Sequence, residues 1–433
     1  MIDLVVVGGG QAGLAACAAA AARGLSVIVC EKGARYGGSA HFSAGILWTA
    51  PDVSTLSSLL PGGDPELGRV LVEGFEPAVA AARDAGVPVT ERWTEHLGFG
   101  VAYRTDIHAL HAHWAGQIDD LRLNTPVRSL LVEEGRVCGV ALAGGEEIRA
   151  RAVLLASGGF QGDRELVKTF LGWDADRALV RSNPWSVGDG FRMARAAGAA
   201  ASSGLGAFYG HTVASPLSSF EPDSYLPLAQ YHSKWCILVN RLGRRYHDEA
   251  LGDEVANQLT LRQPGARGVL LCDESVRRER VVSAPYPHGQ VIDRFEHARS
   301  LGARITSAET VEQLVVRVGE WGVDTVALTD TLKRYEHGGA QDAPISAPAP
   351  LREAPFWAVE FQPTITFTLG GVRVDSWGRV LDRDAGVIEG LYCAGGDAGG
   401  LQGPHYVAGL MLGMVFGPRA VEAVVMDKEE IDV

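Results

Sequence analysis

The sequence predicts an α/β fold built on a parallel sheet, with a second domain of mixed α+β structure inserted into it. Two observations predict the first domain: apolar runs typical of buried strands occur near both ends of the chain, and glycine-rich turns follow them. A third observation predicts the insertion, because residues from about 209 to 363 are richer in proline, tyrosine, histidine and charge than the rest.

Length and composition describe an ordinary globular protein. The chain has 433 residues, 46% hydrophobic and 21% charged, which is too long for one compact core and suggests two domains. The net charge of −13 lacks the basic footprint that nucleic acids and anionic membranes attract, so we expect neither as a partner. With six scattered cysteines, no signal peptide and no long apolar run, the sequence favours a cytoplasmic protein without disulfides.

The first residues carry the pattern of a Rossmann-like dinucleotide fold. An apolar strand, Leu4–Val7, runs into a G-x-G-x-x-G turn, and an alanine-rich helix follows. The glycines of this turn are Gly8, Gly10 and Gly13. They permit the tight turn, the approach of a pyrophosphate to the backbone, and the close packing of helix on strand. The helix is predicted over Leu14–Arg23, and its start presents free N–H groups to the phosphates, with Ala12 in the turn as a further candidate FAD contact.

A second strand and a second glycine-rich loop extend this motif. The strand Ser26–Cys30 ends at Glu31, about 20 residues after the first glycine, where an acidic side chain can accept hydrogen bonds from ribose hydroxyls. The loop that follows is poor in bulky side chains, as an extended FAD molecule requires. Its candidate FAD contacts are Lys32, Gly37, Gly38, Ser39, Ser43, Ala44 and Gly45. This loop favours FAD over NAD as the cofactor.

Later turns supply the remaining candidate FAD contacts. The sequence predicts a hairpin over residues 127–132 and 136–142, strands over residues 153–156 and 390–394, and a helix over residues 191–200. The candidate contacts in or beside these elements are Val127, Ala156, Ser157, Gly158, Asp189, Gly395, Asp397 and Leu410. Asp189 could instead serve only as a helix N-cap.

The sequence predicts some elements of the inserted domain and of the segment that leads back to the first domain. Helices are expected over residues 310–320 and 324–336, and the proline-rich run at residues 342–350 is typical of a connecting loop. A strand over residues 365–369 then leads back to the first domain, and a helix begins near Gly409.

Taken together, these motifs resemble the flavoprotein family of fumarate reductase and succinate dehydrogenase, in the branch without haem or iron–sulfur partners. The segments that carry the likeness are residues 8–13, 31–32, 37–39, 156–160, 188–190, 239–246, 369–371 and 391–395. The resemblance implies an FAD-binding domain of residues 1–208 and 366–433, and a capping domain of residues 209–365 with substrate held between them. FAD is expected to bind non-covalently, because His41 is offset from the position of attachment in some members.

Within the family, residues 239–249 look closest to tricarballylate-dehydrogenase-like members, whereas residues 403–406 resemble a segment of 3-ketosteroid Δ1-dehydrogenases. In that segment a tyrosine faces the substrate ketone. Fumarate reductases carry a histidine where Phe367 stands and an arginine where Tyr406 stands, and both hold substrate carboxylates. These departures argue against fumarate or succinate as the substrate. Asp397 is expected to replace the family's ribityl-binding glutamate, whose place Gly396 takes.

The resemblance also implies the chemistry: hydride passes between a substrate carbon and flavin N5 while a side chain moves a proton at the neighbouring carbon. We predict that the phenol of Tyr406 donates a hydrogen bond to a substrate carbonyl and stabilises the developing enolate. The candidates for the proton-transfer base are His211, Tyr103, His405 and Tyr231, with His211 ranked first.

Other polar residues are assigned more modest roles. Candidates for holding a carboxylate are Arg104, Arg245 and Arg262, although surface ion pairing is the usual fate of such arginines. The histidines at 108, 111 and 113 are interpreted as a polar helix face, and no metal site is predicted.

We therefore predict an FAD-dependent dehydrogenase (desaturase) that forms a C=C bond next to a carbonyl or carboxylate of a small, cyclic or multi-carboxylate substrate. One alternative is an enoate or enone reductase of the fumarate reductase type, supplied with external electrons. Another is a flavin-binding protein without turnover. The direction depends on the flavin potential and on an electron acceptor or donor that the sequence does not identify.

Overall fold

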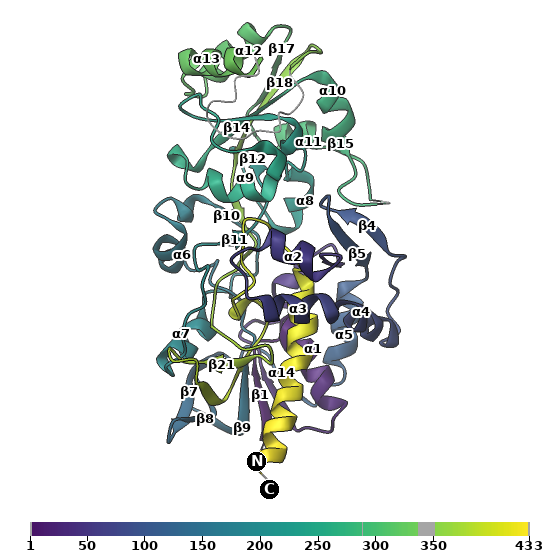
Figure 1. Ribbon diagram of the computed structural model, residues 1–433, viewed down its shortest axis with the longest axis vertical. Helices are drawn as coiled ribbons and strands as arrows, with labels where there is room; N and C mark the ends of the chain where they lie inside the picture. The colour runs from purple at the N-terminus through teal and green to yellow at the C-terminus, as the bar shows by residue number, and fades with distance from the viewer. Residues whose placement is uncertain (1, 288, 337–350, 432–433) are drawn as a thin grey trace. The chain divides into compact units, whose positions relative to one another are not determined.

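The computed structural model describes residues 2–287, 289–336 and 351–431, and the chain divides into two compact units (Figure 1). Unit 1 consists of Met1–Phe170, Ser182–Phe208 and Phe367–Val433, and unit 2 consists of Leu171–Arg181 and Tyr209–Thr366. Each unit combines helices with strands, so the predicted α/β class is confirmed. The short segment Leu171–Arg181, which the sequence analysis left in the first domain, belongs to unit 2.

Unit 1 is built on a largely parallel sheet. Its strand order is β21-β22-β9-β1-β2-β6, and β8 pairs with β9 and β7. The strands are β1 (Ile2–Val7), β2 (Val27–Cys30), β6 (Asp120–Arg122), β7 (Val127–Glu133), β8 (Arg136–Leu142), β9 (Glu147–Leu155), β21 (Arg379–Leu381) and β22 (Val387–Cys393). The central strand β1 runs parallel to both of its neighbours, and its residues Leu4–Val6 are fully buried, as expected for an apolar strand covered on both faces.

Helices pack on this sheet, and two of them meet through small residues. α14 (Leu410–Ile431) lies along α1 (Gln11–Ala21), as Figure 1 shows. A Cβ atom at Gly413 or Gly417 of α14 would come within 2.8 Å or 2.5 Å of the backbone at Ala12, so only glycine permits this approach. The other helices of this part of the chain are α2 (Val53–Leu59), α3 (Pro65–Glu73), α4 (Phe75–Asp84), α5 (Ile107–Ala115), α6 (Arg164–Leu171) and α7 (Asp189–Ala196).

A small antiparallel sheet completes unit 1. Its order is β3-β5-β4, formed by Ile46–Thr49, Gly100–Arg104 and Trp93–His96. In this sheet Trp48 is paired with Ala102, and Leu47 with Tyr103. Because neighbouring residues of a strand point to opposite faces, Trp48 and Tyr103 lie on opposite faces of the sheet.

Unit 2 has its own antiparallel sheet and core. The sheet order is β12-β18-β14-β13, with β17 beside β18. These strands are β12 (Val213–Ala214), β13 (Ile237–Asn240), β14 (Gly268–Cys272), β17 (Ile305–Ala308) and β18 (Phe356–Gln362). The helices are α8 (Tyr225–Leu228), α9 (Asp253–Thr260), α10 (Glu274–Val276), α11 (Arg294–Ser300), α12 (Val311–Gly319) and α13 (Thr325–Glu336). Short strands of unit 2 are β10 (Leu179–Val180), β15 (Val282–Ser283), β16 (Ile292–Asp293) and β19 (Thr364–Ile365). The unit boundary falls within β11 (Phe208–Tyr209), and β20 (Phe367–Thr368) belongs to unit 1.

The structure confirms the hairpin β7–β8 and the helices α12 and α13 and corrects two other elements. The predicted helix over 191–200 runs from Asp189 to Ala196, because Gly198 adopts a left-handed conformation (φ +95°) that ends it. The predicted single strand over 365–369 is wrong, because Thr366 leaves the ladder and its N–H donates to the carbonyl of Tyr209. The proline-rich run at 342–350 lies outside the described residues.

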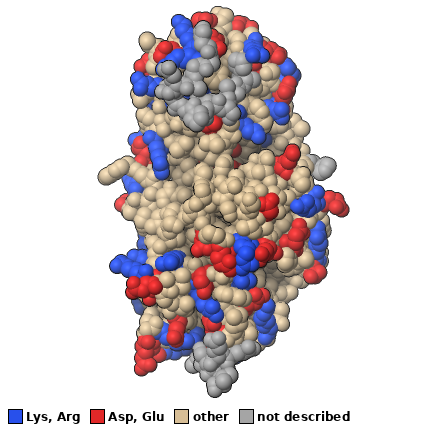
Figure 2. All heavy atoms as spheres, in the orientation of Figure 1, with Lys and Arg blue, Asp and Glu red and all other residues tan. Residues whose placement is uncertain are grey.

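The structure also gives the distribution of surface charge, the state of the cysteines and the character of the helices. On the face shown in Figure 2, lysine and arginine side chains are interspersed with acidic ones, without a continuous basic area. All six cysteines are free thiols. Among the residues that the structure describes, no helix is long and apolar enough to cross a membrane.

Candidate FAD site and active site

Two glycine-rich turns come together at the carboxyl ends of β1 and β2. The N–H of Gly37 donates to the carbonyl of Gly9 at 2.7 Å, and Gly10 and Gly37 form an isolated parallel bridge. A Cβ at Gly38 would lie 3.1 Å from the Cα of Gly10. The turn after the first strand and the loop after the second are therefore in direct backbone contact, an arrangement that larger residues would push apart.

The first turn also packs against the turn that follows β9. Gly8 has φ +109°, and a Cβ there would lie 2.4 Å from the carbonyl oxygen of Ala156. A Cβ at Gly13 would lie 2.0 Å from the carbonyl oxygen of Gly8. At Gly10, by contrast, a Cβ would meet only the Cα of Gly38, at 3.8 Å. The N-terminus of α1 thus has packed backbone behind it and open space at Gly10, where a pyrophosphate would need room.

Glu31 ties the first turn to the second strand. One carboxylate oxygen accepts from the N–H of Gly9 at 2.8 Å, and the other accepts from the N–H of Gly33 at 2.6 Å. Each oxygen keeps a second lone pair, so the carboxylate can still accept from a ribose hydroxyl. Lys32 forms an ion pair with Asp189. Asp189 is not the N-cap of α7, because Gly188 occupies that position.

Asp397 fastens the turn after β9 to the turn after β22. Its Oδ2 accepts from the N–H and the hydroxyl of Ser157 and from the N–H of Gly158. Its Oδ1 is buried and has no hydrogen-bond partner in the described structure. Burial raises the pKa of Asp397 to about 7. A buried acceptor without a donor is costly, so this oxygen is suited to receive a hydroxyl of a bound molecule.

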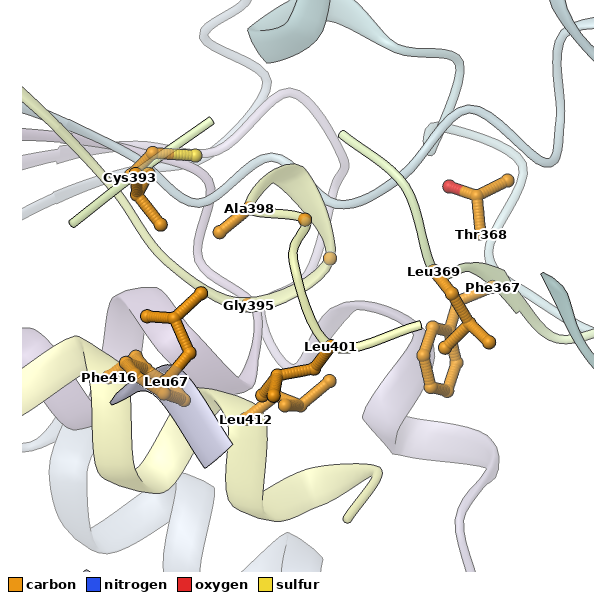
Figure 3. Close-up of a pocket in the computed structure, with 13 residues that line it drawn as sticks. Leu67, Phe367, Thr368, Leu369, Cys393, Gly395, Ala398, Leu401, Leu412 and Phe416 are labelled. Carbon is orange, nitrogen blue, oxygen red and sulfur yellow. The ribbon is translucent and has the colours of Figure 1, made fainter. Parts of the chain in front are cut away.

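A small apolar hollow lies beside this turn (Figure 3). The turn with Gly395 and Ala398 borders one side, and α14 with Leu412 and Phe416 borders the other. The remaining lining residues are Leu67, Phe367, Thr368, Leu369, Val374, Cys393, Gly396, Gly399 and Leu401. The enclosed space is about 30 Å³, enough for one or two water molecules, so the hollow by itself is too small for an organic ring.

Tyr406 belongs to an aromatic cluster in unit 1. Its ring lies 5.1 Å from that of Trp48 and 5.6 Å from that of Phe367, both edge-on. The cluster continues from Trp48 to His96 and Phe99, and from Phe99 to His405. We call these six residues the aromatic cluster. The structure therefore brings together Phe367 and Tyr406, which are 39 positions apart in the chain.

The loop before α14 holds the phenol of Tyr406 in place. Ala408 and Gly409 both have positive φ, at +91° and +46°. A Cβ at Gly409 would lie 1.9 Å from the hydroxyl oxygen of Tyr406, so this hydroxyl occupies the space that glycine leaves. Strain of this kind in a loop next to a buried polar group is often found at functional sites.

His211 is the best-supported base candidate in unit 2. Its Nδ1 lies 2.6 Å from Asp253 Oδ2, and its Nε2 lies 2.8 Å from the Tyr209 hydroxyl. The imidazole is buried, and the ring of Tyr231 packs edge-on at 4.7 Å. The sequence analysis named His211 and Tyr231 but missed Asp253, because nothing in the linear pattern pairs residues 42 positions apart, and it did not consider Tyr209, two positions before His211.

Residues 3–410 match the family model described as the FAD binding domain. The chain belongs to this FAD-binding family. It is 28% identical to a fumarate reductase (cytochrome) of Shewanella frigidimarina, over 94% of this chain and 74% of that protein. It is 26% identical to a 3-oxosteroid 1-dehydrogenase of Mycolicibacterium smegmatis, over 93% of each. The flavoprotein is thus an FAD-dependent oxidoreductase, and the expected cofactor and family are confirmed.

Solved structures show the same fold. The structure of a 3-ketosteroid Δ1-dehydrogenase from Sterolibacterium denitrificans aligns with a TM-score of 0.75 at 20% identity, covering 98% of this chain and 99% of that one. An open flavocytochrome c3 fumarate reductase aligns with a TM-score of 0.72 at 23% identity, covering 98% and 78%. Both branches that the sequence resembles therefore share this flavoprotein's fold.

The residues at the two turns fit FAD. The open space at Gly10 and the N-terminus of α1 suit its phosphates, and the unpartnered Oδ1 of Asp397 suits a hydroxyl of its ribityl chain. Other candidate contacts are engaged locally: Ser39 accepts from Asn183, and Ser43 accepts from the N–H of Gly45. Ala12 is buried in α1, Ala44 accepts from Arg104, and Val127 and Leu410 begin β7 and α14.

His111 is a residue of the FAD region that the sequence interpretation placed wrongly. It was assigned to a polar helix face, yet it is buried and its Nε2 contacts the side-chain oxygen of Gln11, the first residue of α1. A Cβ at Gly37 would lie 3.1 Å from its Nδ1. Burial lowers the pKa of His111 to about 3, so it stays neutral beside both glycine turns. His108 and His113 are exposed, as predicted.

Other candidates have different surroundings from those expected. The Tyr103 phenol donates to Glu76, on the face of the small sheet opposite to Trp48, so the structure does not bring it to Tyr406. Arg245 binds the buried carboxylate of Glu249. His405 lies in the aromatic cluster, and partial burial lowers its pKa. Arg104 and Arg262 are exposed.

Replacing Gly8 with alanine should strongly reduce FAD binding. The new Cβ would meet the Ala156 carbonyl at 2.4 Å in a conformation that already has φ +109°, so the first turn must move. We expect at least about a tenfold loss of FAD affinity, measured by flavin fluorescence titration. Gly86→Ala is the matched control, since Gly86 has φ +73° and open space around it. Unchanged FAD affinity of Gly8→Ala would refute the role of this turn.

Replacing Asp397 with asparagine tests the ribityl contact. The amide oxygen can accept the three bonds from Ser157 and Gly158, while an NH₂ group takes the place of the unpartnered Oδ1. We expect FAD affinity to fall by about tenfold, because the NH₂ group cannot accept the hydroxyl proton that Oδ1 of the carboxylate accepts.

The same variant should change the pH dependence of stability. The folded-state pKa of Asp397, about 7, is above the ordinary 3.8, so FAD-free protein should lose stability as pH rises from about 4 to about 7. Asp397→Asn should lack this part of the slope in denaturant titrations at several pH values. A variant with wild-type FAD affinity and an unchanged slope would contradict both assignments.

Proposed function

We propose that this flavoprotein introduces a C=C bond next to the carbonyl of a small, cyclic and weakly charged substrate. Bound FAD supplies the hydride acceptor, and the chain supplies binding, polarisation of the carbonyl and transfer of a proton. The observation that carries this proposal is the edge-on contact of Phe367 with Tyr406 inside the aromatic cluster.

This contact matters because of what the two positions hold in the fumarate reductases that the sequence resembles, where a histidine and an arginine bind carboxylates. Here a phenyl ring and a phenol stand next to each other, with the Trp48 ring beside the phenol. Aromatic rings offer apolar contact area, and a phenol offers a neutral hydrogen-bond donor. Such a surface suits a ring with a carbonyl oxygen better than a dicarboxylate, whose charges would lose water without gaining cations.

In the proposed reaction, the Tyr406 hydroxyl donates to the carbonyl oxygen as negative charge develops on it. A donor that is fixed before the reaction stabilises an enolate more than water does. Gly409 and the strained loop before α14 provide this fixation. The more acidic α-proton then passes to a base, for which His211 remains the first candidate.

The reverse reaction is the second candidate function. It is favoured by the names of several relatives, among them the Shewanella fumarate reductase and a vinyl phenol reductase of Lactiplantibacillus plantarum, 26% identical over 93% of this chain. The same Tyr406 and the same acid/base group would serve a reductase, because both directions pass through one transition state. The electron acceptor or donor is a further partner that neither candidate identifies.

Anaerobic mixing with a panel of compounds tests both directions. The panel contains cyclohexanone and 4-androstene-3,17-dione as saturated or partly saturated ketones, succinate as the carboxylate, and 2-cyclohexenone and fumarate as acceptors. We expect a cyclic ketone, and not succinate, to bleach the flavin absorbance of the oxidised enzyme. Reoxidation of dithionite-reduced enzyme by 2-cyclohexenone alone would support the reductase. Bleaching by succinate, or reoxidation by fumarate only, would refute the proposed substrate class.

Two variants test Tyr406 with whichever compound responds. Tyr406→Phe removes the donor, and Gly409→Ala displaces it by placing a Cβ 1.9 Å from the hydroxyl oxygen. We expect each to lower the rate of flavin reduction by about 10²-fold or more, as for other lost oxyanion donors, while FAD stays bound. Gly24→Ala, at φ +68° with open space around it, controls for strain alone. A near-normal rate in Tyr406→Phe would remove the assigned role.

A further inference from the structure

Trp185 is a large aromatic residue of unit 1 that stays half exposed beside the candidate ribose contact. It is 49% exposed, whereas Glu31 next to it is buried. A Cβ at Gly33 would lie 3.0 Å from Cδ1 and Nε1 of the indole and 3.0 Å from a carboxylate oxygen of Glu31. The indole and the carboxylate therefore meet at the same piece of backbone. Half exposure leaves aromatic surface there that a ligand can cover.

The loop that carries Trp185 is fixed by its own hydrogen bonds. The N–H of Trp185 donates to the side-chain oxygen of Asn183 at 2.7 Å, and its carbonyl accepts from the N–H of Val187 at 2.9 Å. The amide group of Asn183 in turn donates to the hydroxyl of Ser39 at 2.8 Å. Ser39 belongs to the second glycine-rich loop, so the loop of Trp185 is attached to a candidate FAD loop through these side chains.

A second attachment comes from Lys32, at the end of β2. Its ammonium group forms an ion pair with Asp189, the first residue of α7. The same ammonium nitrogen lies 5.8 Å from the centre of the Trp185 ring, within the range of a cation–π contact. The indole is thus held on a loop whose two ends are both tied to the segment that follows β2.

A third segment closes on the same backbone. The N–H of Asn124 donates to the carbonyl of Gly33 at 2.9 Å. The N–H of Thr125 donates to the carbonyl of Glu31 at 2.8 Å. The end of β2, the residues before β7 and the loop of Trp185 therefore converge at one place in unit 1. Because all three belong to this unit, the arrangement is complete within it.

The order of groups in FAD indicates which part of the cofactor belongs at this place. In a dinucleotide fold the pyrophosphate binds at the N-terminus of the first helix, and the acidic residue after the second strand binds the ribose. The adenine is attached to that ribose, on the side away from the phosphates. The group that follows the Glu31 contact is therefore a flat purine, and the aromatic side chain next to Glu31 is Trp185.

We propose that Trp185 is the stacking surface for the adenine of FAD, and that it contributes to a preference of this chain for FAD over FMN. Aromatic side chains stack on bases without requiring a particular hydrogen-bond pattern. FMN has the same flavin ring but no adenine, so the indole contributes to the binding of FAD alone. This inference concerns the cofactor and goes beyond the proposed function, since it does not depend on the substrate or on the direction of the reaction.

The competing explanation is that Trp185 only packs against Gly33 and shapes its own loop. The two roles predict different losses. The loop is joined through Asn183 to Ser39, in the glycine-rich loop expected along the pyrophosphate and the flavin. Loss of packing would therefore weaken the binding of FMN as well as FAD. Loss of stacking would weaken only ligands that carry adenine.

Titration of the flavin-free full chain with FAD and with FMN separates these roles, with flavin fluorescence as the readout. Trp185→Leu keeps apolar bulk but removes the aromatic face. We expect its affinity for FAD to fall by about 5- to 100-fold, the effect of losing one base–aromatic stack, while its affinity for FMN stays unchanged. Trp185→Phe keeps an aromatic face and should recover most of the FAD affinity. Trp173→Leu is the matched control, since Trp173 is 92% exposed and lies in unit 2.

ADP probes the adenine half by itself. It carries no flavin, so any quenching of tryptophan fluorescence that it causes in the flavin-free chain does not arise from energy transfer to a flavin. We expect ADP to quench the wild type and Trp173→Leu, and FAD to displace it. Trp185→Leu should lose this quenching and bind ADP more weakly by the same factor as FAD.

The opposite results would overturn the assignment. Wild-type affinity of Trp185→Leu for FAD and ADP would remove the stacking role. Equal losses for FAD and FMN would assign Trp185 to the packing of its loop. Quenching of the FAD-loaded protein by ADP, without displacement of FAD, would assign the indole to a separate nucleotide. None of these measurements uses turnover, so their outcome is independent of the test of the proposed desaturase.

Discussion

The direct contact of backbone with backbone at the glycine turns is the constraint on which the rest of unit 1 depends. Gly8 against Ala156, and Gly37 against Gly9, bring the ends of three strands to within hydrogen-bonding distance of one another. Side chains at these positions would separate the strand ends by the thickness of an extra layer of atoms. Because these turns touch, the N-terminus of α1, the carboxylate of Glu31 and the loop of Ser157 lie next to one another at the same edge of the sheet.

Two carboxylates bind the backbone N–H groups of these turns. Glu31 binds the N–H groups of Gly9 and Gly33, and Asp397 binds those of Ser157 and Gly158. In both cases an acidic side chain satisfies backbone donors that a tight turn leaves without carbonyl partners. The same carboxylates keep acceptor capacity for a ligand, so the groups that stabilise the turns are also groups that can bind FAD.

The sequence predicted unit 1 better than unit 2, and the reason is physical. Several elements of unit 1 depend on local patterns of glycine and apolar residues, which can be recognised in the sequence. They include the G-x-G-x-x-G turn, the hairpin β7–β8 and the strand β22. Within unit 2, the two helices with clear periodicity were predicted, but the central strand β18 was not. Its partners β14 and β12 lie far away in sequence, and such pairing leaves no local signal.

The candidate sites divide in the same way. Glycines and acidic residues at fixed spacing predict a dinucleotide-binding site from sequence alone. The Tyr209–His211–Asp253 contacts and the burial of His111 depend on tertiary packing, which the sequence does not show. The surroundings of Tyr103 also depend on tertiary structure: the pleat of β5 places it on the face of the small sheet opposite to Trp48, where its phenol donates to Glu76. A one-residue change of register would have reversed that outcome.

The close fit of α14 against α1 has a consequence for how the protein is made. Gly413 and Gly417 pack against Ala12, so α1 contacts a helix that lies nearly four hundred residues later in the sequence. During synthesis on the ribosome, α1 and the glycine turn before it must wait for some four hundred further residues before their packing partner emerges. Unit 1 is therefore completed only after residues 410–431 have been synthesised, whereas unit 2, apart from its short N-terminal segment, is continuous in sequence and can form earlier.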